Sequence, residues 1–94
     1  MTQNIAQVTT TNGSRYLQQL CKHWSHKMPV EFDAEGGRIS FPNGTIATLT
    51  NEPATLDVTL DVPEGVDVAH MQKVVADHLD RFAFREAPLT FAWN

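Results

Sequence analysis

The chain has 94 residues, of which 41% are hydrophobic and 19% charged, a composition typical of one soluble globular domain that needs neither disulfides nor a structural metal. Its formal charge is −4, and no stretch gathers enough lysine and arginine for a nucleic-acid-binding surface. The N-terminus shows no signal peptide, no apolar run predicts a membrane span, and the single cysteine can form no internal disulfide, so we expect a cytoplasmic protein.

The first predicted elements are a strand and a helix. Apolar and polar residues alternate over 5–10, which predicts the strand. Capping candidates follow at 12–14, and apolar residues then recur at three- and four-residue steps until Pro29 ends the helix. The buried stripe of this helix is predicted to contain Leu17, Leu20, Cys21, Trp24 and Met28.

Four strands in succession are predicted between Val30 and Val62, where the apolar period changes to two. Residues that tolerate tight turns separate them at 35–37, 42–44 and 51–53. A meander of adjacent antiparallel strands results. The apolar positions are Val30, Phe32, Ile39, Phe41, Ala47, Leu49, Leu56, Val58, Leu60 and Val62.

A second helix and a last strand complete the chain. Asp67 can cap this helix, which contains no Gly or Pro from Val68 to Glu86 and can therefore run about 15 residues. Pro88 marks the start of a short final strand. The helical stripe is predicted to contain Met71, Val74, Val75, His78, Leu79 and Phe82, and the strand to point Leu89, Phe91 and Trp93 one way.

The predicted order is β-α-β-β-β-β-α-β in a single domain over residues 1–94. Because two amphipathic helices must bury their stripes against a common surface, we expect an α+β two-layer sandwich, with an antiparallel sheet and both helices on one face. This order resembles the TATA-binding-protein-like architecture. A resemblance in topology alone implies no function.

A first run of titratable residues closes the first predicted helix. At about 100° per residue, His23 and His26 lie about 60° apart, whereas Cys21 lies about 160° from His23, so Cys-x-His-x-x-His supplies no three-ligand zinc set. Cys21 is expected to be a buried small hydrophobe and not a nucleophile. Two interpretations of Lys22, His23, His26 and Lys27 stay open: they complement the negative end of the helix dipole, or they form a site for a carboxylate or phosphate.

A second run closes the second predicted helix. His78 stands on the buried stripe, where it is either a hydrogen-bonded core residue or the lining of a pocket, available as a base or ligand. Arg81 and Arg85 either pair with Asp77 and Glu86 or clamp a carboxylate or phosphate. The candidate ligand-binding residues are Lys22, His23, His26, Lys27, His78, Arg81 and Arg85. No catalytic or metal-binding residue is assigned, and the cofactor is unknown.

Four segments carry a resemblance to a known family. They are 15–27 (RYLQQLCKHWSHK), 37–44 (GRISFPNG), 78–86 (HLDRFAFRE) and the terminal Trp93. In them the chain resembles a family of bacterial domains of unknown function of about this length, found as stand-alone proteins and associated with siderophore-interacting flavoproteins. The resemblance implies an intracellular bacterial protein linked to iron-siderophore handling, and it brings no established activity.

Three functions remain open. The favoured one is a binding or accessory module for an anionic small molecule or a protein partner, such as a siderophore or a siderophore-interacting protein. The second is a non-catalytic assembly protein that forms a homodimer through a sheet edge or the C-terminal aromatic residues. The third, an enzyme, requires that His78 open onto a cavity. Neither nucleic acid nor a membrane is an expected partner.

Overall fold

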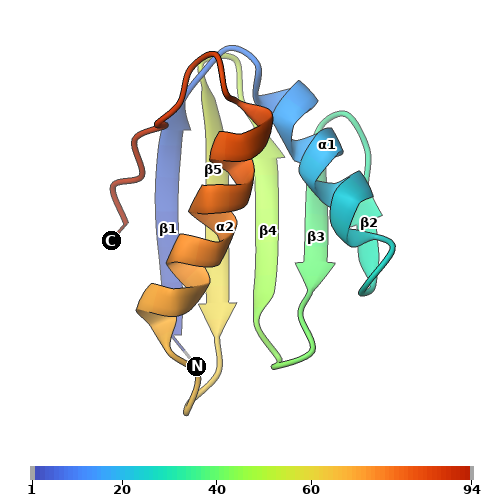
Figure 1. Cartoon of the computed structure of the whole chain (residues 1–94), viewed down its shortest axis with the longest axis vertical. Helices are drawn as coiled ribbons and strands as arrows, with labels where there is room; N and C mark the ends of the chain where they lie inside the picture. Colours follow the sequence, from blue (N-terminus) through green and yellow to red (C-terminus); the bar gives the residue numbers. More distant parts are fainter. Residues whose placement is uncertain (1, 94) are drawn as a thin grey trace.

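The structure is a computed structural model that describes residues 2–93, and these residues form two helices and five strands. Figure 1 shows their arrangement. In chain order the elements are β1 (Thr2–Thr9), α1 (Gly13–Trp24), β2 (Val30–Phe32), β3 (Gly36–Ser40), β4 (Ile46–Asn51), β5 (Thr55–Val62) and α2 (Val68–Phe82). Every one of these elements is predicted by the sequence, with shifts of a few residues at the ends.

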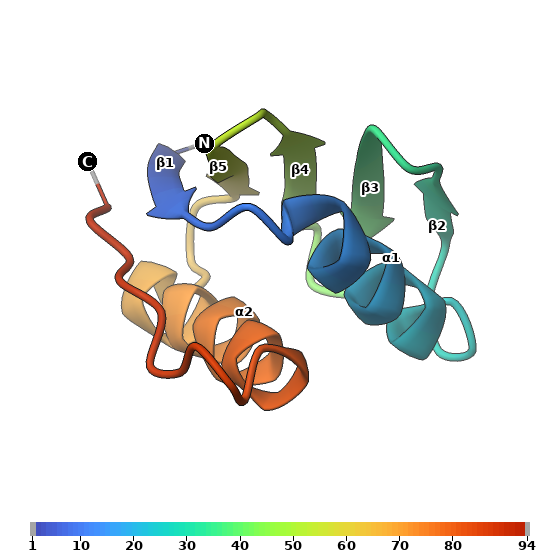
Figure 2. The same cartoon turned by 90° about the horizontal axis from the view of Figure 1, so that it is seen from above.

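The five strands form one antiparallel sheet in the order β1-β5-β4-β3-β2. Strands β2 to β5 follow one another as the predicted meander. Strand β1 lies beside β5, with Thr2 opposite Val62 and Val8 opposite Leu56. Both helices cover the same face of the sheet (Figure 2), which confirms the two-layer α+β sandwich.

Burial alternates along the strands, as a sheet covered on one face requires. In β5, Leu56, Val58, Leu60 and Val62 are buried under the helices, and the residues between them face the other side. The helices bury the facing stripe. Its buried members are Tyr16, Leu17, Leu20, Cys21 and Trp24 of α1 and Met71, Val75 and Leu79 of α2.

Helix α2 has the predicted length and cap. It runs 15 residues, and the Asp67 carboxylate accepts a hydrogen bond from the His70 N–H at 3.1 Å. This bond satisfies one of the backbone donors that a helix leaves free in its first turn. His70 itself is exposed.

Helix α1 ends at Trp24, earlier than the predicted stop at Pro29. The Lys27 N–H donates to the Trp24 carbonyl at 2.9 Å, a bond to the third residue back that tightens the last turn. His26 therefore lies in a turn after the helix, and the helical angle predicted between His23 and His26 does not apply.

The predicted C-terminal strand is wrong, since residues 83–93 contain no strand. Burial does alternate there: Leu89 is buried and Phe91 and Trp93 are half-buried against the core. The Leu89 N–H, however, donates to the Asp80 carboxylate of α2 at 2.9 Å, so the segment is fixed to a helix and pairs with no strand. The described order is β-α-β-β-β-β-α, and the likeness to the TATA-binding-protein-like architecture stays a prediction.

The position of α1 depends on a close approach to β3. A Cβ atom placed on Gly37 would lie 2.5 Å from the Cys21 Sγ and 3.1 Å from the Phe32 Cβ. The first distance leaves no room for a methyl group, and the second is tighter than an ordinary contact. Glycine at this position therefore lets the buried side of α1 rest directly on the strand backbone.

We predict that Gly37→Ala lowers the free energy of unfolding by about 1 to 3 kcal/mol, the usual cost of overpacking a core. The cost should shrink in a Cys21→Ala background, because that change removes the sulfur atom with which the new methyl collides. A double-mutant cycle in urea measures this coupling. Equal costs in the two backgrounds would contradict the proposed contact.

Candidate functional site

The two titratable runs meet where α1 packs against the C-terminal half of α2. The helices run in opposite directions over the sheet (Figure 1). Tyr16 near the start of α1 contacts Glu86 beyond the end of α2, and Trp24 at the end of α1 contacts His78. We call this line of contact, from Tyr16–Glu86 to Trp24–His78, the α1–α2 interface.

Imidazole and aromatic rings fill one end of the α1–α2 interface. The His78 ring centroid lies 4.7 Å from that of Trp24 and 5.8 Å from that of His23. His23 also lies 5.8 Å from Phe82, in an edge-to-face arrangement. Trp24 is 4% exposed, as its predicted core position requires, whereas His23 and His78 are half-buried.

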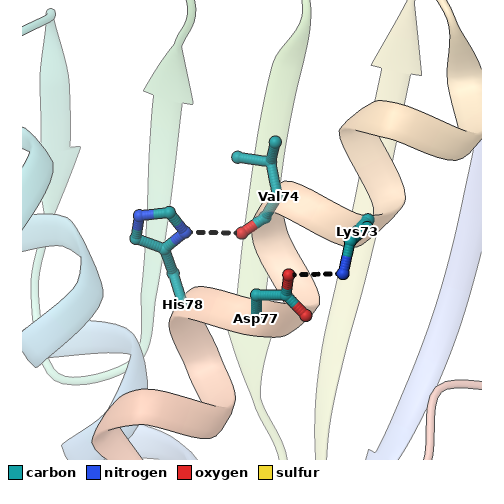
Figure 3. A network of polar contacts seen from close by, with 4 residues as sticks. All are labelled: Lys73, Val74, Asp77 and His78. Atoms are coloured by element: carbon teal, nitrogen blue, oxygen red, sulfur yellow. Dashed lines mark hydrogen bonds and ion pairs between the residues drawn. The ribbon is translucent and has the colours of Figure 1, made fainter.

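His78 is hydrogen-bonded within its own helix, as the first interpretation of the sequence expects. Its Nδ1 lies 2.7 Å from the carbonyl oxygen of Val74, one turn earlier in α2 (Figure 3). A carbonyl oxygen only accepts hydrogen bonds, so Nδ1 carries a proton and donates it to this oxygen. Among the described residues, Nε2 has no hydrogen-bond partner.

Positive charges gather around His23. Burial lowers the pKa of this imidazole, and the neighbouring His78, Lys27, Arg81 and His26, in that order, lower it further. The structure thus brings together five of the seven predicted ligand-binding residues. The other two lie apart from this group: Lys22 is exposed on α1, and Arg85 lies at the opposite end of the interface.

The ion pairs predicted for Arg81 and Arg85 are absent from residues 2–93. Asp77 pairs instead with Lys73, whose Nζ lies 2.9 Å from its carboxylate (Figure 3). Asp77 is four residues from both Lys73 and Arg81, and in the structure it pairs with Lys73. Both arginines are exposed, and no carboxylate in this part of the chain lies within ion-pairing distance of either.

Glu86 is bound by uncharged donors from the start of α1 and the segment before it. The Thr10 hydroxyl donates to both carboxylate oxygens at 3.1 Å, the Asn12 amide donates at 3.1 Å, and the Tyr16 hydroxyl donates to the same oxygen as Asn12. These bonds, that of Tyr16 first, lower the pKa of Glu86, and the bond to the carboxylate raises the pKa of Tyr16. We call Thr10, Asn12, Tyr16 and Glu86 the Glu86 cluster.

A pocket of about 210 Å³ opens beside the Glu86 cluster. Of its lining residues only Arg85 belongs to the predicted site, and the polar residues that the prediction missed are Arg15 and Gln19. A signal for them exists, because Arg15, Gln19 and His23 follow one another at four-residue steps and share one face of the helix. The lining residues are Arg15, Tyr16, Gln19, Phe82, Phe84 and Arg85.

A larger hollow of about 610 Å³ lies over β2, β3 and β4, away from both titratable runs. Its charged lining consists of Glu31, Asp33, Glu35 and Arg38. It contains no histidine and no cysteine. The α1–α2 interface is therefore the better candidate site, although its pocket is smaller.

Metal and thiol chemistry gain no support within residues 2–93. Cys21 is buried, and burial raises the pKa of its thiol to about 11, so the sulfur stays protonated at neutral pH. No three His, Cys, Asp or Glu side chains of these residues gather as a metal site.

Neither described helix has the length and apolar character to cross a membrane.

The chain belongs to the family described as an uncharacterized protein conserved in bacteria (DUF2218), whose model matches residues 5–94. This match confirms the resemblance to a bacterial family of unknown function, and the association with siderophore-interacting proteins stays a prediction. The NMR structure of PA4090 from Pseudomonas aeruginosa is similar, with 39% sequence identity and a TM-score of 0.81, and the match covers 100% of this chain and 96% of that chain. No curated protein matches the chain.

We predict that Glu86→Gln lowers the free energy of unfolding by about 1 kcal/mol at pH 7. The glutamine amide has one acceptor oxygen, whereas the donors around Glu86 use both oxygens of its carboxylate. The loss is small because the site is exposed. Because the pKa of Glu86 is lowered in the folded protein, its contribution is present above the ordinary pKa and is lost as pH falls through the lowered one. Urea unfolding at several pH values should show the wild-type advantage shrinking below about pH 4. An advantage that stays constant into acid would contradict the carboxylate's role.

The lowered pKa of His23 leads to a second prediction. In the wild type His23 should titrate below about 6.5, and Arg81→Gln should raise its midpoint by removing a neighbouring positive charge. Arg81→Lys keeps the charge and serves as the matched control. Because the folded pKa is the lower one, the stability contributed by neutral His23 is full above about pH 6.5 and is lost as pH falls through the folded pKa.

The His23 ring-proton NMR shift, followed against pH, measures this midpoint directly. An Arg81→Gln midpoint equal to that of the wild type would show that Arg81 does not act on His23.

Proposed function

We propose that this DUF2218 protein is a binding or accessory module that holds an anionic small molecule, or an acidic group of a protein partner, at the α1–α2 interface. The observation that supports the proposal is the gathering of His23, His26, Lys27 and Arg81 with no carboxylate paired to them in residues 2–93. Positive groups held together repel one another, and a bound anion relieves that repulsion.

The acidic side chains of α2 and the segment after it are all engaged elsewhere. Asp77 pairs with Lys73, Asp80 accepts the N–H of Leu89, and Glu86 is bound within its cluster. The cations at the interface therefore keep their donors available for a ligand from solution. Charged hydrogen bonds of arginine and histidine to carboxylate or phosphate are among the stronger polar contacts.

Siderophores and their iron complexes form one ligand class within this proposal. The class enters through the family resemblance, and its chemistry agrees with the interface because many siderophores carry carboxylates or acidic phenols. A cytoplasmic location belongs to the same proposal, since one buried, unpaired cysteine suits a reducing compartment.

We predict that citrate and inorganic phosphate bind the wild-type protein and raise the pKa of His23. Because the protonated imidazole attracts the anion, affinity should increase as pH falls through the His23 midpoint, and it should weaken with added salt. The His23→Ala/His26→Ala double variant should bind about tenfold more weakly or worse, as expected when charge-assisted hydrogen bonds are lost. NMR titration measures both affinity and the His23 midpoint.

His70→Ala is the matched control, because this histidine is exposed near the start of α2, away from α1. It should bind like the wild type. A panel of iron-siderophore complexes, titrated in the same way, tests the ligand class. Equal binding by the wild type and the double variant, or no binding of any anion, would overturn the proposed function.

A further inference from the structure

We propose that the pocket beside the Glu86 cluster takes a planar aromatic carboxylate. This inference rests on the proposed function and deepens it by naming the ligand class for one end of the α1–α2 interface. It stands on the chemistry of the pocket lining, which combines two guanidinium groups and a carboxamide with three aromatic rings.

The polar half of the pocket suits a carboxylate. Arg15 and Gln19 come from α1 and Arg85 from the segment after α2, so donors reach the pocket from both sides. A guanidinium group offers two parallel N–H donors that match the two oxygens of a carboxylate. In residues 2–93 neither arginine has a carboxylate within ion-pairing distance, even though Glu86 follows Arg85 directly.

Glu86 does not compete for these arginines. Its carboxylate oxygens already accept hydrogen bonds from Thr10, Asn12 and Tyr16, all of them uncharged donors. The Tyr16 hydroxyl donates to Glu86 in this cluster, so the hydroxyl proton is not available to a ligand in the pocket. The negative charge is thus held on one side, while the arginine donors stay free.

The apolar half of the pocket suits a flat ring. Phe82 is half-buried, and Phe84 is 72% exposed, an unusual position for so large an apolar side chain. The Arg85 guanidinium carbon lies 5.7 Å from the Phe84 ring centroid, which places a cation over an aromatic face. A ring inserted here gains ring contacts and covers the exposed surface of Phe84.

The size of the pocket limits the ligand. Sites for drug-sized molecules usually enclose about 300 to 1,000 Å³. At about 210 Å³, this pocket has room for a single ring with its carboxylate. A larger ligand would extend along the interface toward Arg81 and His23, whose charges also favour an anion.

Three probes of similar size separate the two halves of this inference. Benzoate has the ring and the charge, cyclohexanecarboxylate has the charge without the flat ring, and benzamide has the ring without the charge. We expect benzoate to bind most tightly by NMR titration and to shift the amide signals of 15–19 and 82–85. Arg15→Gln and Arg85→Gln should each weaken benzoate binding about tenfold or more, while Phe84→Leu should remove the preference over cyclohexanecarboxylate.

Arg38→Gln is the matched control, because this arginine lies on β3 in the other hollow, and it should leave benzoate affinity unchanged. Thermal unfolding midpoints near the wild-type value identify the variants that keep the fold. Equal binding of benzoate and cyclohexanecarboxylate would overturn the aromatic specificity, and tight benzamide binding would overturn the role of the arginines. No benzoate binding, with citrate still raising the His23 pKa, would overturn this inference and leave the proposed function intact; no anion binding at all would remove both.

Discussion

The hydrogen bonds to Glu86 fix how the two helices meet. Glu86 lies 76 residues from Thr10, 74 from Asn12 and 70 from Tyr16, so the bonds join the end of α2 to the start of α1. With that end fixed and the helices antiparallel, His78 lies opposite Trp24 and Phe82 opposite His23. This attachment and the packing of both helices on the sheet together place the imidazoles, arginines and aromatic rings along the α1–α2 interface.

Charge is divided between the two layers of the molecule, although the net charge is −4. Eight of the eleven Asp and Glu residues fall between 31 and 67, the segment of β2 to β5 and its turns, which has Arg38 as its one Lys or Arg. Helix α1 contains no acid. An acidic protein can thus present basic side chains on its helical layer. The overall negative charge disfavours the binding of nucleic acid, but it does not prevent a small anion from binding at this local group of positive charges.

The periodic features of the structure could be predicted from the sequence, and the features that depend on distant partners could not. Alternation in 55–62 and the stripe of α2 report burial directly, so those elements were predicted correctly. Alternation in 88–93 also reports burial, and the same pattern arises whether a segment packs on a helix or pairs at a sheet edge. Here the segment is bonded to α2, and the predicted strand is absent. The helical spacing allowed Asp77 two partners, Lys73 and Arg81, and the spacing alone does not distinguish the Lys73 pair that forms. No local pattern links Glu86 to residues more than 70 positions earlier.

Exposure of the cations sets what kind of ligand this interface can hold. Two unit charges 4 Å apart interact by only about 1 kcal/mol in water, and salt at physiological strength screens them over about 8 Å. Arg15, Arg81 and Arg85 are exposed, so the repulsion between their charges is small. For the same reason, their attraction for an anion is weak on its own. Selective binding at this surface needs a second contribution from burial of apolar area. The rings of Phe82 and Phe84 lie beside Arg85 and supply that contribution, which is why a ligand with both a charge and a flat apolar body fits this interface better than an inorganic anion.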